Sequence, residues 1–535
     1  MSKHHHHQAP HHSGRRSFLK TAGMAAAIAP FIHHGLAVNP LSQKTLFRKL
    51  GGHVQLSDKI MVFIELNGGN DGLNTVIPLD QYSPLSQHRP RVLIPENKVL
   101  PLSGISNTGL HPSLNAIQAL FDEGKVSIVQ NVGYPEQDYS HFRSMDIWMT
   151  GANSQETLSS GWLGRMLDQE YPGYPDGYPN TSAPDPLAIN IGTVSPISLM
   201  GNSFPMGISV GNVGEVYDLI NDYIEPAPNS PYGDELSFIR AIMQNTKLYF
   251  DVIKEAATLG QNLSAQYPDP GQNSLADQLK IVARLINGGL ETPVYLVSIN
   301  GFDTHAEQVE AGEPTLGNHA TLLGRIGEAV AAFLDDIQLM GKSDAVCAMT
   351  YSEFGRTIGD NFSRGTDHGA AAPLFVFGKK VVPGIIGANP IIPPTLNGSA
   401  DIPMQHDFRQ VYASVLQDWF QVNNSDDLLQ GSYSTLPIFK TTSSVQESPG
   451  QTPWQTSSHP NPIRNTATIT FTIPAAIIRL ELMDAQGRRL HTIAEGNYAA
   501  GTHQVVLERR GLPAGTYFYT LFVNGMRVTR KLLLL

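Results

Sequence analysis

The chain has 535 residues, of which 41% are hydrophobic and 16% charged, so it can build a core and is not of the disordered class. At roughly 150 residues per domain, this length predicts about three domains. The formal net charge of -11 argues against nucleic acid or an anionic membrane surface as the main partner, because both require clustered Lys and Arg. An anionic substrate is compatible with this charge, because a bound metal inverts the local sign.

The first residues are typical of an export signal. Arg15–Lys20 reads Arg-Arg-Ser-Phe-Leu-Lys, and the apolar stretch Thr21–Ile32 follows it. This order is typical of a cleaved signal, and the stretch is shorter than the roughly 20 residues of a transmembrane span. The segment resembles the twin-arginine signal, which exports folded proteins. We expect a signal peptide over residues 1–38, no transmembrane span in the mature form and the twin-arginine machinery as a partner; an ordinary secretory signal is the alternative.

Residues 45–440 are predicted to form one α/β domain. Its expected strands are buried apolar runs, and its expected helices carry apolar residues every three or four positions. The strands are expected at 61–66, 126–132, 294–299, 345–350 and 374–377, and the helices at 113–123, from Ser140, at 275–286 and at 322–337. This alternation predicts a mostly parallel sheet with helices on both faces. The lone cysteine, Cys347, lies in an apolar run and is expected to be a small buried hydrophobe.

Polar side chains follow the ends of several predicted strands. The carboxyl ends of parallel strands meet at one edge of a sheet, so these side chains are expected to gather there. The candidates for metal ligands are Asp71, Asp303, His305, Glu353, Asp367 and His368. Carboxylates mixed with imidazoles suit Zn, Mn or Fe, whereas carboxylates alone would favour Mg or Ca. The sequence therefore predicts a divalent metal site whose ion is not specified.

Each of these motifs also has a structural interpretation. Asp303 could cap a following helix, and Asp71 could serve the turn in which it lies. Glu353 could form an internal ion pair with Arg356, and the loop at 367–369 could be an ordinary surface loop. Four independent structural explanations would then have to hold together at strand ends. Because one metal site explains all four motifs at once, we favour it.

Four segments resemble a known bacterial family. They are 65–75 (Glu-Leu-Asn-Gly-Gly-Asn-Asp-Gly-Leu-Asn-Thr), 301–305 (Gly-Phe-Asp-Thr-His), 351–357 (Tyr-Ser-Glu-Phe-Gly-Arg-Thr) and 365–369 (Gly-Thr-Asp-His-Gly). On these motifs the chain, from residue 58 to about residue 425, resembles the family called domain of unknown function 1501. That family is similar to the alkaline phosphatase and sulfatase superfamily. Members of the superfamily hydrolyse phosphate or sulfate esters at one or two metals, with a Ser, Thr or modified Cys nucleophile.

The resemblance assigns roles to the metal candidates. Asp71 would be the first metal carboxylate, and Asp303 with His305 would serve a second cation. Glu353 would stand where the superfamily has an Asp, and His368 would be a late ligand. The fold implied is an alkaline-phosphatase-like, mostly parallel sheet.

The resemblance also assigns the catalytic candidates. The stretch Gly124–Gly151 would contain the nucleophile turn, which places Ser140 or His141 near the nucleophile position, with Thr75 as a fallback. A hydroxyl at a helix N-terminus beside a cation ionises more readily. Arg356 could clamp an anionic oxygen of the substrate.

The sequence departs from the superfamily pattern at three points. No Cys or Ser is followed by x-Pro-x-Arg, the spacing of Asp303 and His305 is shorter than Asp-x-x-x-His, and Glu353 has no adjacent His. The first hypothesis is a metal-dependent hydrolase of phosphate or sulfate esters. The alternatives are a non-catalytic cell-surface binding protein, for example for glycans, and a structural role in a surface assembly.

The C-terminal residues form a separate unit. Residues 441–458 are rich in Ser, Thr, Gln and Pro and predict a linker, and short strands spaced over 459–535 predict a β-sandwich. His459–Pro462, Leu482–Arg488, Leu512–Tyr517 and Lys531-Leu532 resemble the sorting domain of type IX secretion. The resemblance implies the type IX machinery as a partner and a location at the cell surface or outside the cell; a carbohydrate-binding sandwich is the alternative.

Overall fold

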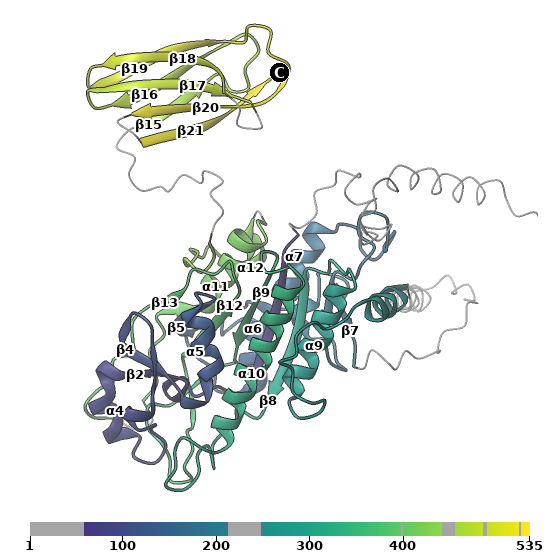
Figure 1. Ribbon diagram of the computed structural model, residues 1–535, viewed down its shortest axis with the longest axis vertical. Helices are drawn as coiled ribbons and strands as arrows, with labels where there is room; N and C mark the ends of the chain where they lie inside the picture. The colour runs from purple at the N-terminus through teal and green to yellow at the C-terminus, as the bar shows by residue number, and fades with distance from the viewer. Residues whose placement is uncertain are drawn as a thin grey trace, which may run out of the picture. The chain divides into compact units, whose positions relative to one another are not determined.

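The computed structural model describes residues 58–211, 248–396, 400–422, 424–440, 455–484, 489–523 and 526–535. The chain divides into two compact units, Met1–Lys440 and Thr441–Leu535 (Figure 1). The predicted signal peptide at residues 1–38 lies outside the described residues. Among the helices in the described ranges, none is both long enough and apolar enough to cross a membrane.

A nine-stranded sheet runs through the first unit. Eight strands follow one path, in the order β13 (Gly384–Ile386), β5 (Val126–Gly133), β12 (Ala372–Phe377), β9 (Val346–Tyr351), β1 (Ile60–Asn67), β8 (Val294–Asn300), β6 (Ala188–Asn190) and β7 (Ile208–Ser209). The ninth, β14 (His406–Asp407), pairs with β5. All pairings in this sheet are parallel except those of β12, which runs antiparallel to β5 and β9. The predicted mostly parallel sheet is thus confirmed.

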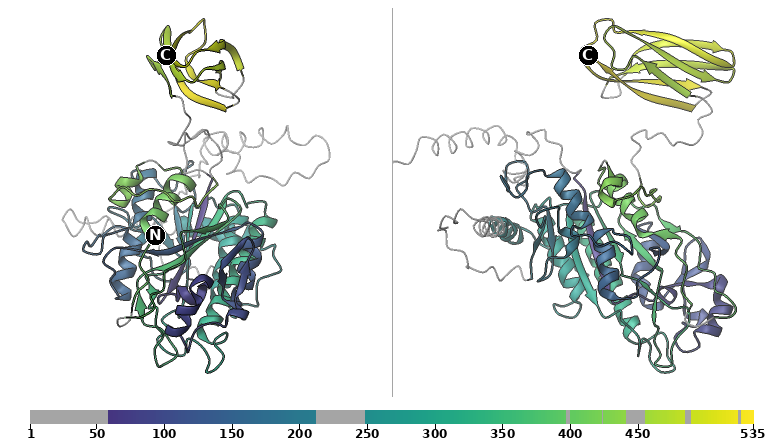
Figure 2. Two further views of the ribbon diagram at one scale, coloured as in Figure 1. Left: turned by 90° about the vertical axis from the view of Figure 1, so that its left-hand side faces the viewer. Right: turned by 180° about the vertical axis from the view of Figure 1, so that it is seen from behind.

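Helices cover both faces of this sheet, as Figures 1 and 2 show. On one face, Phe63 of β1 meets Trp162 of α7 (Trp162–Glu170), with ring centroids 5.6 Å apart. Leu66, three residues further along β1, points to the opposite face and lines a small cavity with Leu323 and Ile326 of α10 (Asn318–Leu339). This alternation follows from the two-residue period of a strand and gives both faces an apolar surface.

The remaining helices extend these two layers. α5 (Asn115–Asp122) and α9 (Ser274–Asn287) contact α10. On the other face, Trp148 of α6 (His141–Thr150) stacks on Phe408 of α11 (Phe408–Ser414) at 4.6 Å. The shorter elements of the first unit are α3 (Gly72–Thr75), α4 (Tyr82–His88), α12 (Ser425–Leu429), β2 (Val76–Pro78), β3 (Leu100–Leu102), β4 (Ile105–Leu110), β10 (Gly355–Arg356) and β11 (His368–Gly369).

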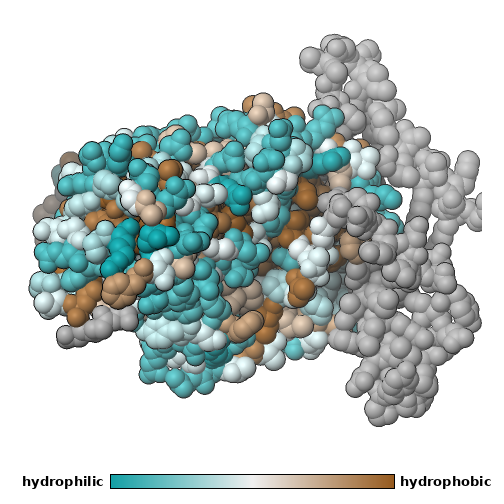
Figure 3. Space-filling model, turned by 90° about the horizontal axis from the view of Figure 1, so that it is seen from below, coloured by the Kyte–Doolittle hydropathy of each residue, from teal (hydrophilic) through white to brown (hydrophobic). Residues whose placement is uncertain are grey.

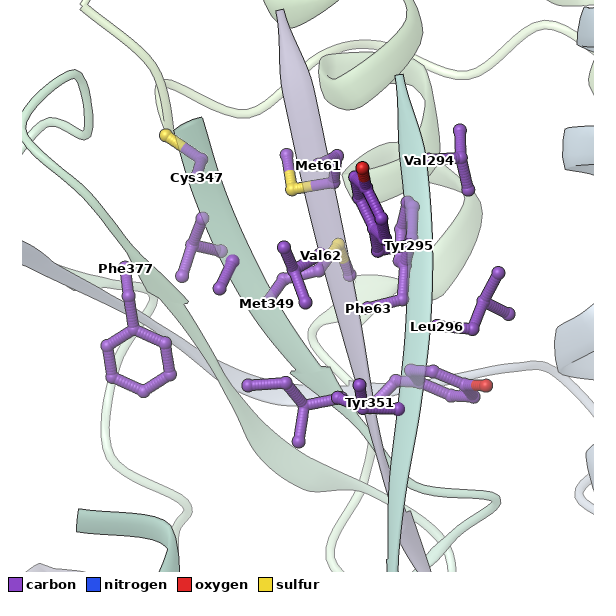
Figure 4. Packing of buried hydrophobic residues seen from close by; sticks show 14 of the residues in the cluster. Met61, Val62, Phe63, Val294, Tyr295, Leu296, Cys347, Met349, Tyr351 and Phe377 are labelled. Atoms are coloured by element: carbon purple, nitrogen blue, oxygen red, sulfur yellow. The ribbon is translucent and has the colours of Figure 1, made fainter. Parts of the chain in front are cut away.

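The three central strands carry the middle of the core. Figure 4 shows Met61 of β1, Tyr295 of β8 and Met349 of β9 within it, and all three side chains are fully buried. Cys347 is also fully buried, as predicted for a small hydrophobe, and burial raises the pKa of its thiol well above the ordinary value. The predicted strands and helices of the first unit all occur, with ends shifted by a few residues.

Some elements were not predicted. β6 and β7 are three and two residues long, too short to show a strand period in the sequence. β15 (Gln455–His459) begins inside the predicted linker at 441–458. Its residues are polar, so its strand conformation depends on antiparallel pairing with β16 rather than on an apolar pattern.

The second unit is an antiparallel sandwich, as predicted. One sheet has the order β15, β16 (Thr466–Ile473) and β19 (Gly501–Glu508). The other has the order β18 (Arg489–Tyr498), β17 (Ala476–Met483), β20 (Gly515–Val523) and β21 (Met526–Leu534). Alternate residues such as Phe471, Leu480 and Tyr519 are buried in one apolar cluster.

Candidate metal centre at the carboxyl edge of the sheet

The predicted site residues follow strands that run in the same direction. β1 lies between β8 and β9, and β5 lies beyond β12. Asp303 follows β8, Glu353 follows β9, and His141 begins α6 after β5. The carboxyl ends of these strands meet at one edge, and the side chains gather there as the sequence predicted.

Three histidines surround the carboxylate of Asp303. Its Oδ2 lies 3.5 Å from Nε2 of His141, and its Oδ1 lies 3.3 Å from Nε2 of His305 and 3.3 Å from Nε2 of His368. The ligand atoms of His141, Asp303 and His368 all lie within 4.8 Å of one another. Two imidazole nitrogens and one carboxylate oxygen, with His305 beside them, are donors that zinc and other borderline divalent metals accept.

The other ring nitrogen of each histidine has an oxygen partner. Nδ1 of His141 lies 2.8 Å from Oε1 of Glu353, and Nδ1 of His305 lies 3.0 Å from Oδ1 of Asp367. Nδ1 of His368 lies 2.8 Å from the carbonyl oxygen of Tyr139. These oxygens accept hydrogen bonds, so each Nδ1 carries the proton, and a neutral ring then presents the Nε2 lone pair.

The Nε2 atoms of His305 and His368 lie only 2.9 Å apart. At this distance either one ring donates a proton to the other, or the two lone pairs share a cation. Burial lowers the pKa of His368, and the charge of Arg356 lowers it further, so the ring is neutral near pH 7. The cluster therefore suits a metal ion better than extra protons.

The central carboxylate is held in its ionised form. Burial alone would raise the pKa of Asp303, but the hydrogen bond and charge of Arg356 outweigh it, so the pKa lies below its ordinary value. For Asp367, burial is likewise outweighed by hydrogen bonds with His305 and Asn361, and the pKa is lowered. Both carboxylates are thus anionic at neutral pH.

Glu353 and Asp367, predicted as direct ligands, lie behind the histidines. Oε1 of Glu353 accepts the backbone N–H of Gly68 at 2.8 Å as well as Nδ1 of His141, and the residue is 1% exposed. Carboxylates in this position fix the orientation of metal-binding histidines. The geometry thus favours an orienting role for both residues.

Arg356 is not available to a substrate, contrary to the proposed clamp. Its side chain is 0% exposed, and its guanidinium donates to the carbonyl oxygens of Gly68, Gly69, Phe302 and Thr366 and to Oδ1 of Asp303. Nε, Nη1 and Nη2 each donate to at least one of these oxygens, and the buried group cannot reach a substrate. Arg356 therefore ties three site loops together and pairs with Asp303 rather than with Glu353.

Asp71 is not brought to the cluster. It is fully buried, and both of its carboxylate oxygens accept from Nη1 of Arg89, at 2.9 and 2.8 Å. Oδ2 also accepts from Nε2 of Gln308 at 2.6 Å. Burial would raise the pKa of Asp71, but the Arg89 charge outweighs it and lowers the pKa. In this structure its oxygens serve a buried ion pair instead of a metal.

Ser140 stands beside the cluster as the N-cap residue of α6. Its backbone N–H donates to Oδ1 of Asp138 at 2.7 Å, while its side chain makes no capping hydrogen bond. Its chain neighbours, Tyr139 and His141, both contact the cluster, so Ser140 remains a nucleophile candidate. The fallback, Thr75, is buried and donates its hydroxyl to the carbonyl of Asp71 at 2.7 Å.

Sequence reasoning missed several polar residues of the site. Gln308 is fully buried, donates to Asp71, and accepts from Thr304 at 3.1 Å and Thr366 at 2.7 Å. Glu65, partly exposed on β1, has its pKa raised to about 7 by burial and by the charge of Glu353. Arg89 and Gln308 lie outside the four motifs, and no residue pattern around them marks them. A charged residue inside an apolar strand, as Glu65 is, was a usable signal.

The Gly-rich turn after β1 is required by close packing. Gly68 has φ 124°, and a Cβ on it would lie 2.2 Å from the backbone nitrogen of Asp303. An L-residue would be strained there and would displace the Asp303 loop. The turn thus lets the β1 and β8 loops meet beneath the cluster.

Comparison with known proteins gives matches for both units. Residues 457–534 match the family described as "Secretion system C-terminal sorting domain", which implies export to the cell surface or the extracellular space. No curated protein matches the chain in sequence.

Two solved structures illustrate what the chain is similar to. The PsFucS1 sulfatase from Pseudoalteromonas sp. is 11% identical, with 84% of each chain covered and a TM-score of 0.32. A protein in the alkaline phosphatase superfamily from Vibrio parahaemolyticus is 9% identical, with 81% of each chain covered and a TM-score of 0.31. Residues 58–432 match the family described as "Protein of unknown function (DUF1501)", as the motifs indicated. The chain therefore belongs to the DUF1501 family.

Proposed function

We propose that the protein is an exported, metal-dependent hydrolase of phosphate or sulfate esters. The carrying observation is the convergence of three Nε2 atoms on Asp303, with every Nδ1 fixed by an oxygen acceptor. This arrangement presents lone pairs and a negative charge to one point, which a bound cation would satisfy. Its anionic oxygens and neutral rings match the donors of a divalent metal, which we leave as Zn, Mn, Fe, Mg or Ca.

His141, His305, His368 and Asp303 would hold the metal. Such an ion, when bound, polarises an ester oxygen and offsets the charge that develops on it. Glu353 and Asp367 would orient the histidines, and Arg356 would keep Asp303 ionised and in place. Asp71 would act only through the buried network that supports the turn after β1.

Ser140 would supply the attacking hydroxyl, with a water molecule as the alternative nucleophile. Its place at the N-terminus of α6 favours negative charge on its oxygen, because the helix dipole is positive there. The neighbouring contacts of Tyr139 and His141 hold it at the cluster. Export would proceed through the twin-arginine signal and then through the type IX machinery.

The experiment is an ester screen on the full chain with each divalent metal, using p-nitrophenyl phosphate and p-nitrophenyl sulfate. We expect metal-dependent turnover that Asp303→Ala abolishes and that Ser140→Ala lowers strongly. A metal-loaded Asp303→Ala variant with the wild-type rate would refute the proposal. Val194→Ala, which truncates an exposed side chain outside the cluster, is the control.

A metal-dependent binding protein without turnover is the second candidate. The observation that favours it is the burial of Arg356, which is 0% exposed and pairs with Asp303, so it cannot hold an ester oxygen. It predicts saturable, metal-dependent binding of glycans or anionic esters with no product formed. Product formation that follows the metal content would exclude it.

A further inference from the structure

Two phenylalanines beside the cluster are unusually exposed. Phe142 and Phe362 are each 91% exposed, the highest values among the large hydrophobic side chains of the described residues. Burying a Phe side chain fully stabilises a fold by about 1.5–3 kcal/mol relative to leaving it exposed. Because these two rings are exposed, they do not contribute this energy to the fold. On the face shown in Figure 3, hydrophobic residues form separate groups among hydrophilic ones rather than one continuous surface.

Both residues are adjacent to residues that contact the cluster. Phe142 directly follows His141 in the first turn of α6. Phe362 follows Asn361, whose side-chain amide donates to the carbonyl of His305 at 2.8 Å and to Oδ1 of Asp367 at 3.1 Å. Each of the two most exposed rings is therefore one residue away in sequence from a cluster histidine or from a residue that hydrogen-bonds to the cluster.

The loop that carries Phe362 is firmly held. The backbone N–H of Asn361 donates to the carbonyl of Gly365 at 2.9 Å, and Asp360 pairs with Arg91 at 2.9 Å. The guanidinium carbon of Arg91 lies 4.6 Å from the centre of the Phe362 ring. An aromatic side chain fixed before binding loses less entropy when a ligand packs against it.

Two arginines near the rings, Arg91 and Arg143, are already paired. Arg91 pairs with Asp360, and Arg143, one residue after Phe142, pairs with Asp146 and donates to the carbonyls of Asn153 and Ser154. Arg364, two residues after Phe362, has no ion-pair partner among the described residues, so this loop can meet one anionic group but not several. Two separate rings around a polar centre instead suit a ligand that alternates apolar faces with polar edges, as a sugar does.

We propose that Phe142 and Phe362 stack on sugar rings, so that the substrate is a carbohydrate carrying a single phosphate or sulfate ester. This inference rests on the proposed function, because the ester must lie at the metal while the sugar contacts the rings. Phe142 and Phe362 would set specificity and affinity without touching the reacting atoms.

The test uses calorimetric binding of non-hydrolysable ligands to the zinc-loaded full chain. The sugar ligands are the phosphonate analogues of the 6-phosphates of glucose, galactose and N-acetylglucosamine, and methylphosphonate is the matched anion without a sugar. We expect at least one sugar ligand to bind about tenfold tighter than methylphosphonate. Phe142→Ala and Phe362→Ala should each weaken that ligand by about three- to tenfold and leave methylphosphonate binding unchanged.

Controls separate this inference from the proposed function. Ile477→Ala truncates an exposed side chain of the second unit and should change neither affinity. Methylphosphonate binding without any preference for the sugar ligands would overturn the inference and leave the proposed function standing. Failure of all ligands to bind would overturn both. Phe-dependent sedimentation with phosphatidylcholine vesicles would assign the rings to a lipid surface and also overturn the sugar assignment.

Discussion

The network around Asp71 and the cluster around Asp303 lie at the same edge of the sheet and use similar side chains. Asp71 is fully buried, and Arg89 balances its charge inside the protein. Asp303 is 47% exposed at its side chain, and three imidazoles face it besides Arg356. Residue type and position at a strand end therefore do not distinguish a structural carboxylate from a metal-binding one. The hydrogen-bond donors and acceptors around the carboxylate do.

Removing the carboxylate of Asp71 should have the largest effect on stability. Asp71→Asn leaves the Arg89 charge buried without a counter-ion, and we expect the free energy of unfolding to fall by about 3–5 kcal/mol. Metal bound per folded molecule should stay unchanged. Urea unfolding measures the first quantity, with Asp344→Asn as control, because its partner Lys379 is exposed. An equal loss in both variants would contradict the account.

The same pair predicts a pH dependence. Since the folded pKa of Asp71 is lowered, its stabilisation is complete above the unfolded pKa of about 3.9 and is lost as pH falls through the folded pKa. The stability difference between wild type and Asp71→Asn should therefore be constant near neutral pH and shrink below about pH 3.9. Unfolding curves over this range check it, and a difference that grows on acidification would refute it.

Gly68→Ala should disturb the cluster through the backbone. The strain at φ 124° is expected to lower stability by about 1–3 kcal/mol, and the new Cβ would push the Asp303 loop away and weaken metal binding. Gly104→Ala is the matched control, because Gly104 has φ 79° and no atom within 4 Å of a Cβ. Metal titration should separate the two variants; equal metal affinity would show that the turn does not position the cluster.

Glu353→Gln should have a smaller effect, confined to metal binding. Loss of the charge behind His141 is expected to weaken metal affinity by about tenfold, as for other residues that orient histidine ligands. Glu65→Gln is the control, because Glu65 has a pKa raised to about 7 and has no recorded contact with a cluster histidine. If both variants kept the wild-type affinity, the orienting role of Glu353 would be wrong.

Much of the fold could be predicted because apolar periodicity reports burial directly. The strands at β1, β8 and β9 and the helix α10 are long enough for this signal. The antiparallel direction of β12 could not be predicted, since a buried strand has the same composition in either direction. The short strands β6 and β7 carried too few residues to form a pattern.

The membership of the cluster was easier to predict than the part each residue plays. Strand ends identified Asp303 and His305, and the loop after Glu353 identified His368, whereas His141 was predicted only near the nucleophile position and not as a metal ligand. Sequence position could not show that Glu353 and Asp367 lie behind the histidines, because that depends on which ring nitrogen each carboxylate contacts. Arg89 and Gln308, which hydrogen-bond to Asp71, lie outside the motifs and carry no pattern of their own.

The central claim is that the cluster, and not Asp71, binds a divalent metal. Elemental analysis of the full chain, purified without chelators, tests it most directly. We expect bound metal in wild type and in Asp71→Asn, and its loss in Asp303→Ala and His368→Ala with the fold retained. A folded, metal-free wild type that takes up no added metal, or metal that survives both cluster substitutions, would contradict the claim.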